Sequence, residues 1–146
     1  MASSHTIGVV INTYPHKNRK TDLHRCLQSL IKQTHGDFVV TIIENYQNKK
    51  LVKRIVASYE NSLKIKVFNS TAKKLSSLFN LGWMKTKNKY LAYLADDAEA
   101  GNDWLKNINK ELNRSVKIAA CSGPIISTCF PAGEMHRLYL LSQSNI

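Results

Sequence analysis

The sequence predicts an α/β fold, a three-layer sandwich in which helices cover a mainly parallel central sheet. Short apolar runs rich in β-branched residues alternate five times with segments whose apolar residues recur at helical spacing. No Gly/Ser/Pro-rich linker and no internal repeat interrupts this alternation along the 146 residues. Strands that alternate with helices are typical of parallel sheets. We therefore expect one domain over residues 1–146.

The first third of the chain predicts a strand, a helix and a second strand. Residues 6–12 are almost continuously apolar, as in a buried strand. The helix is expected to start at a Thr21 or Asp22 cap and to stop near Gly36, since glycine is frequent just past a helix end. Its apolar face would consist of Leu23, Cys26, Leu27, Leu30 and Ile31. The second strand covers residues 38–43.

The rest of the chain continues the alternation. A helix over residues 49–59 would turn Leu51, Val52, Ile55 and Val56 inward. Residues 63–68 alternate apolar side chains with lysines, which is typical of a strand with one face in water. The remaining elements are predicted from their apolar spacing alone: a helix over 71–84, a strand over 90–94, a helix over 103–112 and a fifth strand over 117–121.

The composition is that of a folded protein, with 43% hydrophobic and 21% charged residues. No apolar run approaches the roughly 18 residues that span a bilayer, and the N-terminus has no basic leader, so we expect no signal peptide. Three cysteines without metal-ligand spacing predict reduced thiols and a cytoplasmic protein.

The chain is strongly basic, with 21 Lys and Arg against 10 acids and a net charge of +11. This excess favours polyanionic partners such as nucleic acid, an anionic membrane surface or phosphate-bearing substrates. No RNP-type segment, zinc-finger spacing or arginine-rich block accompanies the lysines, which makes nucleic acid the weaker prediction. We expect most lysines to lie on solvated faces, with peripheral contact to an anionic membrane as the second interpretation.

Two adjacent carboxylates, Asp96 and Asp97, follow the apolar strand over 90–94 and precede a polar turn and a helix with Trp104 near its start. Carboxylates at a strand end present oxygen ligands to Mg²⁺ or Mn²⁺, which keeps open positions for substrate phosphates. The alternative is that both acids cap the next helix. Parallel sheets bind ligands outside the carboxyl ends of their strands. That rule places residues 12–14, 44–45 and 96–97 on one edge.

Five segments in the same order resemble glycosyltransferase family 2, whose members have the Rossmann-like GT-A fold. Residues 9–14 resemble its "VVIPTYN" strand, 27–34 its "L-x-S-L-x-x-Q-T" helix, 42–45 its "VVDD", 79–83 its "RN-x-G", and 95–97 its acidic "DxD". Three positions depart from the pattern. Asn12 stands where proline is common, Ala95 takes the first acidic position, and Phe79 replaces a frequent arginine, whose contact Lys73 or Lys74 would have to supply.

The resemblance implies a transferase that moves a sugar, with Mn²⁺ or Mg²⁺ and with inversion, from a nucleotide-sugar donor to a hydroxyl acceptor. The donor would be a UDP-sugar, and the acceptor a glycan, lipid or protein. Asp97 would bind the metal, and the donor would be contacted by Thr13, Tyr14, Glu44, Asn80 and Asp96. Structural alternatives are that Tyr14 covers the core edge, that Glu44 is a solvated acid capping the second helix, and that Gly82 is a helix-packing glycine.

Family members of this type use a carboxylate as the catalytic base, and the acceptor half of this chain is abbreviated. Glu134 is the only acid after Glu111 and thus the C-terminal candidate, although an exposed acid at a helix start is the alternative. Two further functions stay open: a nucleotide-sugar-binding remnant without turnover, and a basic nucleic-acid-binding α/β module.

Overall fold

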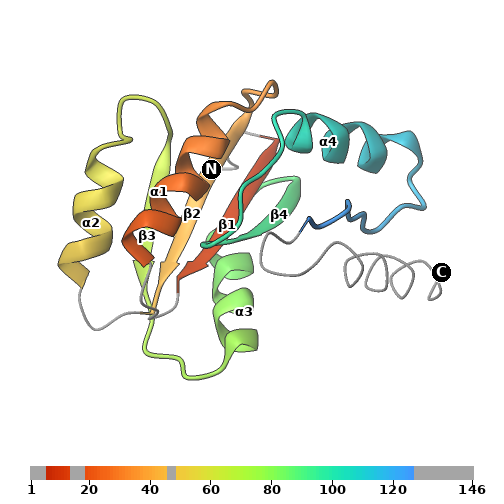
Figure 1. The fold of residues 1–146 in the computed structure, drawn as a ribbon. Coiled ribbons are helices and arrows are strands. Elements are labelled where there is room, and N and C mark those ends of the chain that lie inside the picture. Colours follow the sequence, from red (N-terminus) through yellow and green to blue (C-terminus); the bar gives the residue numbers. More distant parts are fainter. Residues whose placement is uncertain (1–5, 14–18, 46–48, 127–146) are drawn as a thin grey trace. The chain divides into compact units, whose positions relative to one another are not determined.

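The computed structural model describes residues 6–13, 19–45 and 49–126, and in this part strands alternate with helices (Figure 1). The elements in chain order are β1 Ile7–Thr13, α1 Arg19–Ile31, β2 Phe38–Glu44, α2 Lys49–Ala57, β3 Ile65–Asn69, α3 Leu75–Lys85, β4 Tyr90–Ala95 and α4 Trp104–Arg114. None of the helices in these ranges is long and apolar enough to cross a membrane.

The four strands form one sheet in the order β3-β2-β1-β4, and each of its neighbouring pairs is parallel. β1 is buried along its whole length and lies between β2 and β4. The chain adds β2 and β3 on one side of β1 and then returns to place β4 on the other side. This arrangement confirms the predicted α/β fold with a parallel sheet.

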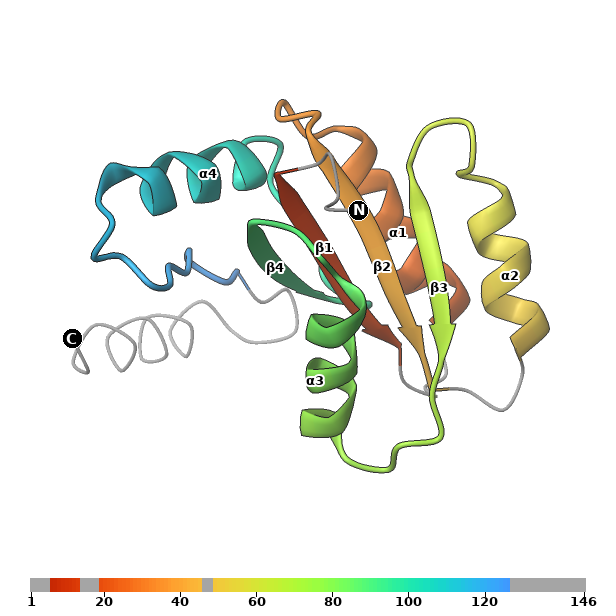
Figure 2. The ribbon, with the colours of Figure 1, turned by 180° about the vertical axis from the view of Figure 1, so that it is seen from behind.

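Helices cover both faces of the sheet, as Figures 1 and 2 show from opposite sides. The larger core lies between the sheet and α1, α2 and α4; its buried members include Val9, Ile11, Leu27, Val52 and Leu105. The smaller core lies on the other face, where Val10 and Ile43 pack against Leu78 of α3. Neighbouring residues of a strand point to opposite faces, so Val9 and Val10 belong to different cores.

The helices differ more than the strands from the predicted ranges. α1 starts at Arg19, so Thr21 and Asp22 lie inside the helix instead of capping it. The negative charge of Asp22 in the first turn stabilises the helix by interacting with the positive end of its dipole. α3 starts at Leu75, four residues later than predicted. Before it, the Ser70 hydroxyl accepts a hydrogen bond from the Ala72 N–H at 3.1 Å. Such local side-chain bonds compete with helix formation.

The predicted fifth strand over residues 117–121 is wrong. These residues pair with no strand in the described part of the chain and follow a turn at Ser115. There the Ile118 N–H donates to the Ser115 carbonyl at 3.1 Å. Residues 119–121 are exposed, so the short apolar run that suggested a buried strand is not buried.

Contacts divide the chain into two compact units, residues 1–110 and 111–146. The first unit contains the whole four-stranded sheet and every member of both cores. The structure describes residues 111–126 of the second unit, which finish α4 and continue without a further helix or strand. The single domain expected over residues 1–146 stays a prediction.

Candidate functional site

Polar residues gather where the parallel strands end. The strand register sets Thr13 of β1 beside Glu44 of β2, and Asn12 beside Ala95 of β4. Asp96 is the next residue after Ala95 and therefore follows at the same edge. The strand order reverses between β1 and β4, and parallel sheets bind ligands outside such a reversal. The structure thus brings the predicted Thr13, Glu44 and Asp96 to one edge.

Thr13 and Glu44 are buried at this edge. The Thr13 hydroxyl donates to the Ile43 carbonyl at 3.4 Å. Glu44 is 1% exposed, and its carbonyl accepts a hydrogen bond from the Ser70 N–H at 2.7 Å. Burying a carboxylate costs several kcal/mol unless its environment compensates. The alternative in which Glu44 is a solvated acid is therefore wrong.

Asn12 also lies at this edge, although no role in binding was predicted for it. Its side chain is buried, and neither the amide nitrogen nor the amide oxygen has a hydrogen-bond partner within the described structure. Leaving a buried polar group unsatisfied costs about 1–3 kcal/mol. The signal available in the sequence was a polar residue at the end of an otherwise apolar strand. Asn12 thus offers a donor and an acceptor at this edge, on the face of the sheet opposite to Thr13.

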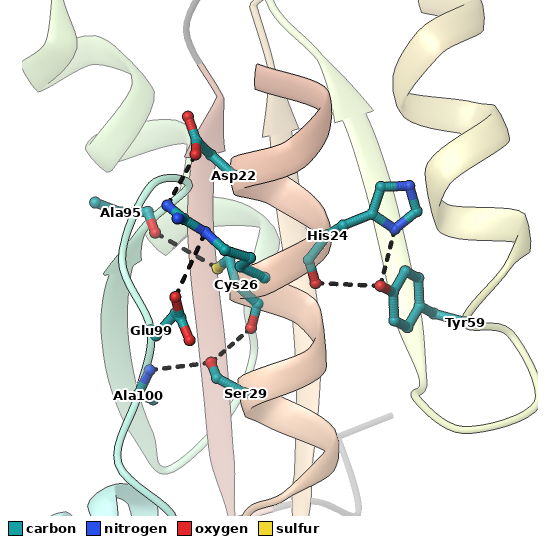
Figure 3. Close-up of polar contacts among 9 residues, drawn as sticks. Asp22, His24, Cys26, Ser29, Tyr59, Ala95, Glu99 and Ala100 are labelled. Atoms are coloured by element: carbon teal, nitrogen blue, oxygen red, sulfur yellow. Dashed lines mark hydrogen bonds and ion pairs between the residues drawn. The ribbon is translucent and has the colours of Figure 1, made fainter. Parts of the chain in front are cut away.

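Residues 96–103, here called the acidic loop, connect β4 to α4 and carry four of the ten acids: Asp96, Asp97, Glu99 and Asp103. Figure 3 shows that side chains of α1 reach this loop and the end of β4. The Cys26 thiol donates to the Ala95 carbonyl, with 3.5 Å between sulfur and oxygen. The Ser29 hydroxyl accepts a hydrogen bond from the Ala100 N–H at 3.0 Å.

The end of α1 and the residues just after it hold the second half of the acidic loop. The Gln33 amide nitrogen donates to the Gly101 carbonyl at 2.7 Å, and its amide oxygen accepts from the Leu105 N–H at 3.0 Å. The second bond satisfies one of the free N–H groups at the start of α4. The Thr34 hydroxyl donates to the Asp103 carboxylate at 2.6 Å. We call Ser29, Gln33 and Thr34 the α1 clamp.

The negative charges of the acidic loop affect the Cys26 side chain of α1. Burial, followed by the charges of Asp96, Asp97 and Glu99, raises the pKa of the Cys26 thiol from 9.0 to about 12. Cys26 is therefore a neutral thiol near pH 7 and is neither a nucleophile nor a metal ligand there. The Arg25 guanidinium lies 3.4 Å from the Glu99 carboxylate, but both side chains are exposed, so this pair stabilises little.

Asp96 and Asp97 do not cap the following helix, because α4 starts only at Trp104. Asp96 is buried and Asp97 is exposed. Within the described ranges, no group of three or more His, Cys, Asp or Glu side chains could hold a metal ion. Mg²⁺ is often bound by one or two carboxylates together with substrate phosphates. The pair therefore fits an ion whose coordination the substrate completes.

The other predicted site residues are less clustered. Asn80 lies on the exposed side of α3, a helix that Figures 1 and 2 place beside the carboxyl end of β1. Gly82 is a helix-packing glycine, since an added Cβ would lie 2.4 Å from a methyl carbon of Val10. Tyr14 and Glu134 fall outside the described residues.

Comparison with known proteins gives one family and one group of structures. The sequence model described as "Glycosyl transferase family 2" matches residues 10–145. No curated protein matches the chain significantly. The crystal structure of S. aureus TarS 1-349 is similar with a TM-score of 0.65 and 17% identity, over 82% of this chain and 39% of that chain. Its complex with UDP-GlcNAc has a TM-score of 0.67 and 18% identity, over 84% of this chain and 37% of that chain. Its complex with UDP has a TM-score of 0.64 and 18% identity, over 84% of this chain and 38% of that chain.

This chain thus spans less than two fifths of the length of those three structures. At such low sequence identity the similarity concerns the fold. It confirms the predicted GT-A-like, Rossmann-like sandwich.

Proposed function

The chain belongs to glycosyl transferase family 2, and from this premise we propose that it transfers a sugar from a nucleoside-diphosphate sugar to a hydroxyl acceptor. The observation that carries the proposal is the convergence of Thr13, Glu44 and Asp96 at the carboxyl edge of a parallel sheet. The TarS structures include complexes with UDP and UDP-GlcNAc, which supports a UDP-sugar as the donor.

The end of β1 and the end of β2 would bind the nucleoside. Glu44 corresponds to the acid that the family uses on the uracil or the ribose. At the same strand end, on the α3 face of the sheet, Asn12 has an amide donor and an amide acceptor without hydrogen-bond partners in the described structure, and polar groups of the donor substrate would pair with them. Tyr14 would complete this part of the site. Asn80, on the helix beside the strand ends, would contact the diphosphate.

Asp97, with Asp96 beside it, would hold Mn²⁺ or Mg²⁺ against the diphosphate. Such an ion neutralises the negative charge that develops on the departing phosphate oxygen. The α1 clamp holds residues 100, 101 and 103, and the Ala98 N–H donates to the Ala95 carbonyl at 3.1 Å, so the loop on both sides of Asp97 would need little reorganisation when the donor binds. Positioning of this kind is a large part of catalysis.

Transfer with inversion needs a base that removes the proton from the acceptor hydroxyl, and Glu134 is our candidate for this role. The region after Cys121 would form the acceptor surface, and the acceptor would be a glycan, lipid or protein hydroxyl. Both cysteines of the described part, Cys26 and Cys121, are free thiols, which supports a cytoplasmic location.

Calorimetric titration with UDP tests the donor site and the metal site separately. Mn²⁺ is expected to increase the UDP affinity at least about tenfold. Asp97→Asn should abolish this increase, whereas the control Glu60→Gln, an exposed acid next to α2, should keep it. An equal response to Mn²⁺ in both variants would reject Asp97 as the metal ligand. Absence of UDP binding in the wild type would reject the donor proposal.

A donor-hydrolysis screen with Mn²⁺ tests turnover. We expect hydrolysis of at least one UDP-sugar by the wild type, and a loss of more than about tenfold in Asp97→Asn. A similar loss of hydrolysis in Glu134→Gln would support Glu134 as the base. UDP binding without hydrolysis would support a binding protein without turnover. Steeply salt-dependent binding of random oligonucleotides without UDP binding would support the nucleic-acid alternative.

A further inference from the structure

The outer face of α3 differs from that of the other helices. α1, α2 and α4 each carry four Lys, Arg, Asp or Glu residues, but α3 has none between Leu75 and Met84. Leu75, Phe79 and Trp83 follow one another at intervals of four residues, so they lie along one side of the helix. All three are exposed, and Trp83 reaches 63%. This side of α3 is therefore apolar and uncovered within the described structure.

Tyr93 extends the apolar surface from α3 onto β4. Its ring packs edge-on against the Phe79 ring, with 5.0 Å between centroids, and its hydroxyl donates to the Phe79 carbonyl at 3.3 Å. We call the exposed residues of this surface the α3 patch: Leu75, Phe79, Trp83, Met84 and Tyr93. Their exposed fractions correspond to an area on the order of 500 Å². The largest apolar patch of a typical monomer has about this size and is often functional.

Lysines flank α3 along the chain. Residues 61–95 contain seven lysines and no acid or arginine. Five exposed lysines lie just before α3, at its end and directly after it: Lys73, Lys74, Lys85, Lys87 and Lys89. A partner of this surface must therefore offer negative charge together with an apolar layer.

We propose that the α3 patch docks onto an anionic lipid bilayer, with Trp83, Met84 and Leu75 in the interfacial layer and the lysines against the lipid headgroups. Tryptophan favours that layer, and each lysine near an anionic membrane adds to the attraction. A second copy of the chain would bring a second set of lysines against the first, with like charges opposed. Nucleic acid offers no apolar layer for Leu75 and Met84, and the stretch has no arginine for bidentate phosphate contacts.

This docking goes beyond the proposed sugar transfer and is tested without donor or acceptor. The patch lies wholly within residues 75–93, on a helix and a strand of the first unit. The membrane contact is peripheral, because it uses side chains on the surface of a folded helix.

Tryptophan fluorescence of the full chain with vesicles provides the first test. The chain has two tryptophans, exposed Trp83 and half-buried Trp104. With vesicles of phosphatidylcholine and phosphatidylglycerol, the emission is expected to shift to shorter wavelength, and the Trp83→Ser variant should show no shift. Pure phosphatidylcholine vesicles should give at most a weak shift, because the lysines then lack anionic headgroups.

Charge reversal of matched lysine pairs provides the second test. Lys85→Glu with Lys87→Glu should weaken flotation with the anionic vesicles by at least about tenfold. The control is Lys50→Glu with Lys53→Glu, which changes the net charge by the same amount at exposed positions of α2, on the other face of the sheet. This control should weaken flotation with the anionic vesicles less than about threefold. Thermal melting confirms that each variant is folded.

Three results would overturn the proposal. Equal weakening by the two lysine pairs would mean that net charge, and not this surface, drives binding. Trp83-dependent binding of oligonucleotides without binding of the anionic vesicles would assign the surface to nucleic acid. Trp83-dependent dimers in sedimentation velocity without vesicle binding would assign it to a second copy of the chain.

Discussion

At the scale of single residues, neighbours decide the chemical state of side chains on α1. The Tyr59 hydroxyl donates to the His24 carbonyl at 3.1 Å, and the His24 Nδ1 lies 2.9 Å from the same hydroxyl oxygen (Figure 3). Because the Tyr59 hydroxyl proton is donated to the His24 carbonyl, the second hydrogen bond requires that Nδ1 carries a proton and donates it to the hydroxyl oxygen. The two hydrogen bonds between His24 and Tyr59 link α1 to the segment after α2.

Cys26 should be unreactive in the folded protein. Only thiolates are alkylated readily, and the Cys26 pKa is raised from 9.0 to about 12 by burial and by the charges of the acidic loop. At about pH 8.5, iodoacetamide should modify exposed Cys121 and leave Cys26 intact, as measured by peptide mass spectrometry. In urea both should react. Because the unfolded thiol ionises above its ordinary pKa, this residue makes the folded state less stable as pH rises from 9 toward 12.

The hydrogen bond from Thr34 should control the acidity of Asp103. This bond is the largest cause of the lowered pKa of Asp103, followed by the charge of Lys106. Thr34→Val should therefore raise the pKa of Asp103 in an NMR titration. A lowered pKa stabilises the folded state above the ordinary carboxyl pKa, and this contribution disappears as pH falls through the lowered value. An unchanged Asp103 titration in Thr34→Val would contradict the assigned cause.

At the scale of elements, close backbone approach and side-chain bridges set how helices lie on the sheet. α3 comes near β1 at Gly82, where a side chain would meet Val10. α4 is tied at its start to α1 through Gln33. Both contacts join elements next to the candidate site, so each can be tested by its effect on stability.

Gly82→Ala should destabilise the protein by about 1–3 kcal/mol, because the new methyl group overlaps Val10 in a packed core. Alanine favours a helix over glycine by about 1 kcal/mol, which offsets part of this cost. Gly36→Ala is the matched control, since an added Cβ there has no neighbour within 4 Å; its effect should range from none to a gain of about 1 kcal/mol. Urea unfolding measures both, and equal effects would contradict the close approach.

Gln33→Ala should destabilise the acidic loop. It removes the bonds to the Gly101 carbonyl and the Leu105 N–H, which corresponds to a cost of about 1–3 kcal/mol. Gln28→Ala, at an exposed position of α1, should change the stability by less than about 0.5 kcal/mol. Hydrogen exchange should become faster in residues 96–105 of the Gln33 variant alone. Equal exchange in both variants would show that the α1 clamp does not order the loop.

The strands could be predicted because their signal is local. Each of the four starts and ends within two residues of its predicted range, as β4, Tyr90–Ala95, shows. The shared edge of Thr13, Glu44 and Asp96 follows from parallel pairing once the strands are known. The α1 clamp was not predicted, since Gln33 and Leu105 are 72 residues apart and no local sequence pattern indicates that they are in contact. Residues 117–121 were assigned wrongly because an exposed apolar run and a buried strand look alike in sequence.

At the scale of the whole molecule, the first unit should fold without the second. Both cores and all four strands lie between Ile7 and Ile108. A chain ending at Arg114 should therefore melt cooperatively, within about 4 °C of the full chain. It should also keep UDP binding and lose turnover if Glu134 is the base. Non-cooperative melting in circular dichroism would show instead that residues 115–146 are needed for folding.

The strand order β3-β2-β1-β4 also has a consequence for the time course of folding. β1, β2 and β3 follow one another along the chain and pair in that order, whereas β4 must close a loop from β1 of more than 70 residues. Contacts between distant residues form late, because closing long loops costs entropy before any contact is gained. We expect the β1–β2–β3 half to form the nucleus. The edge that carries Asp96 and Asp97 would then mature in the final step on the way to the native state.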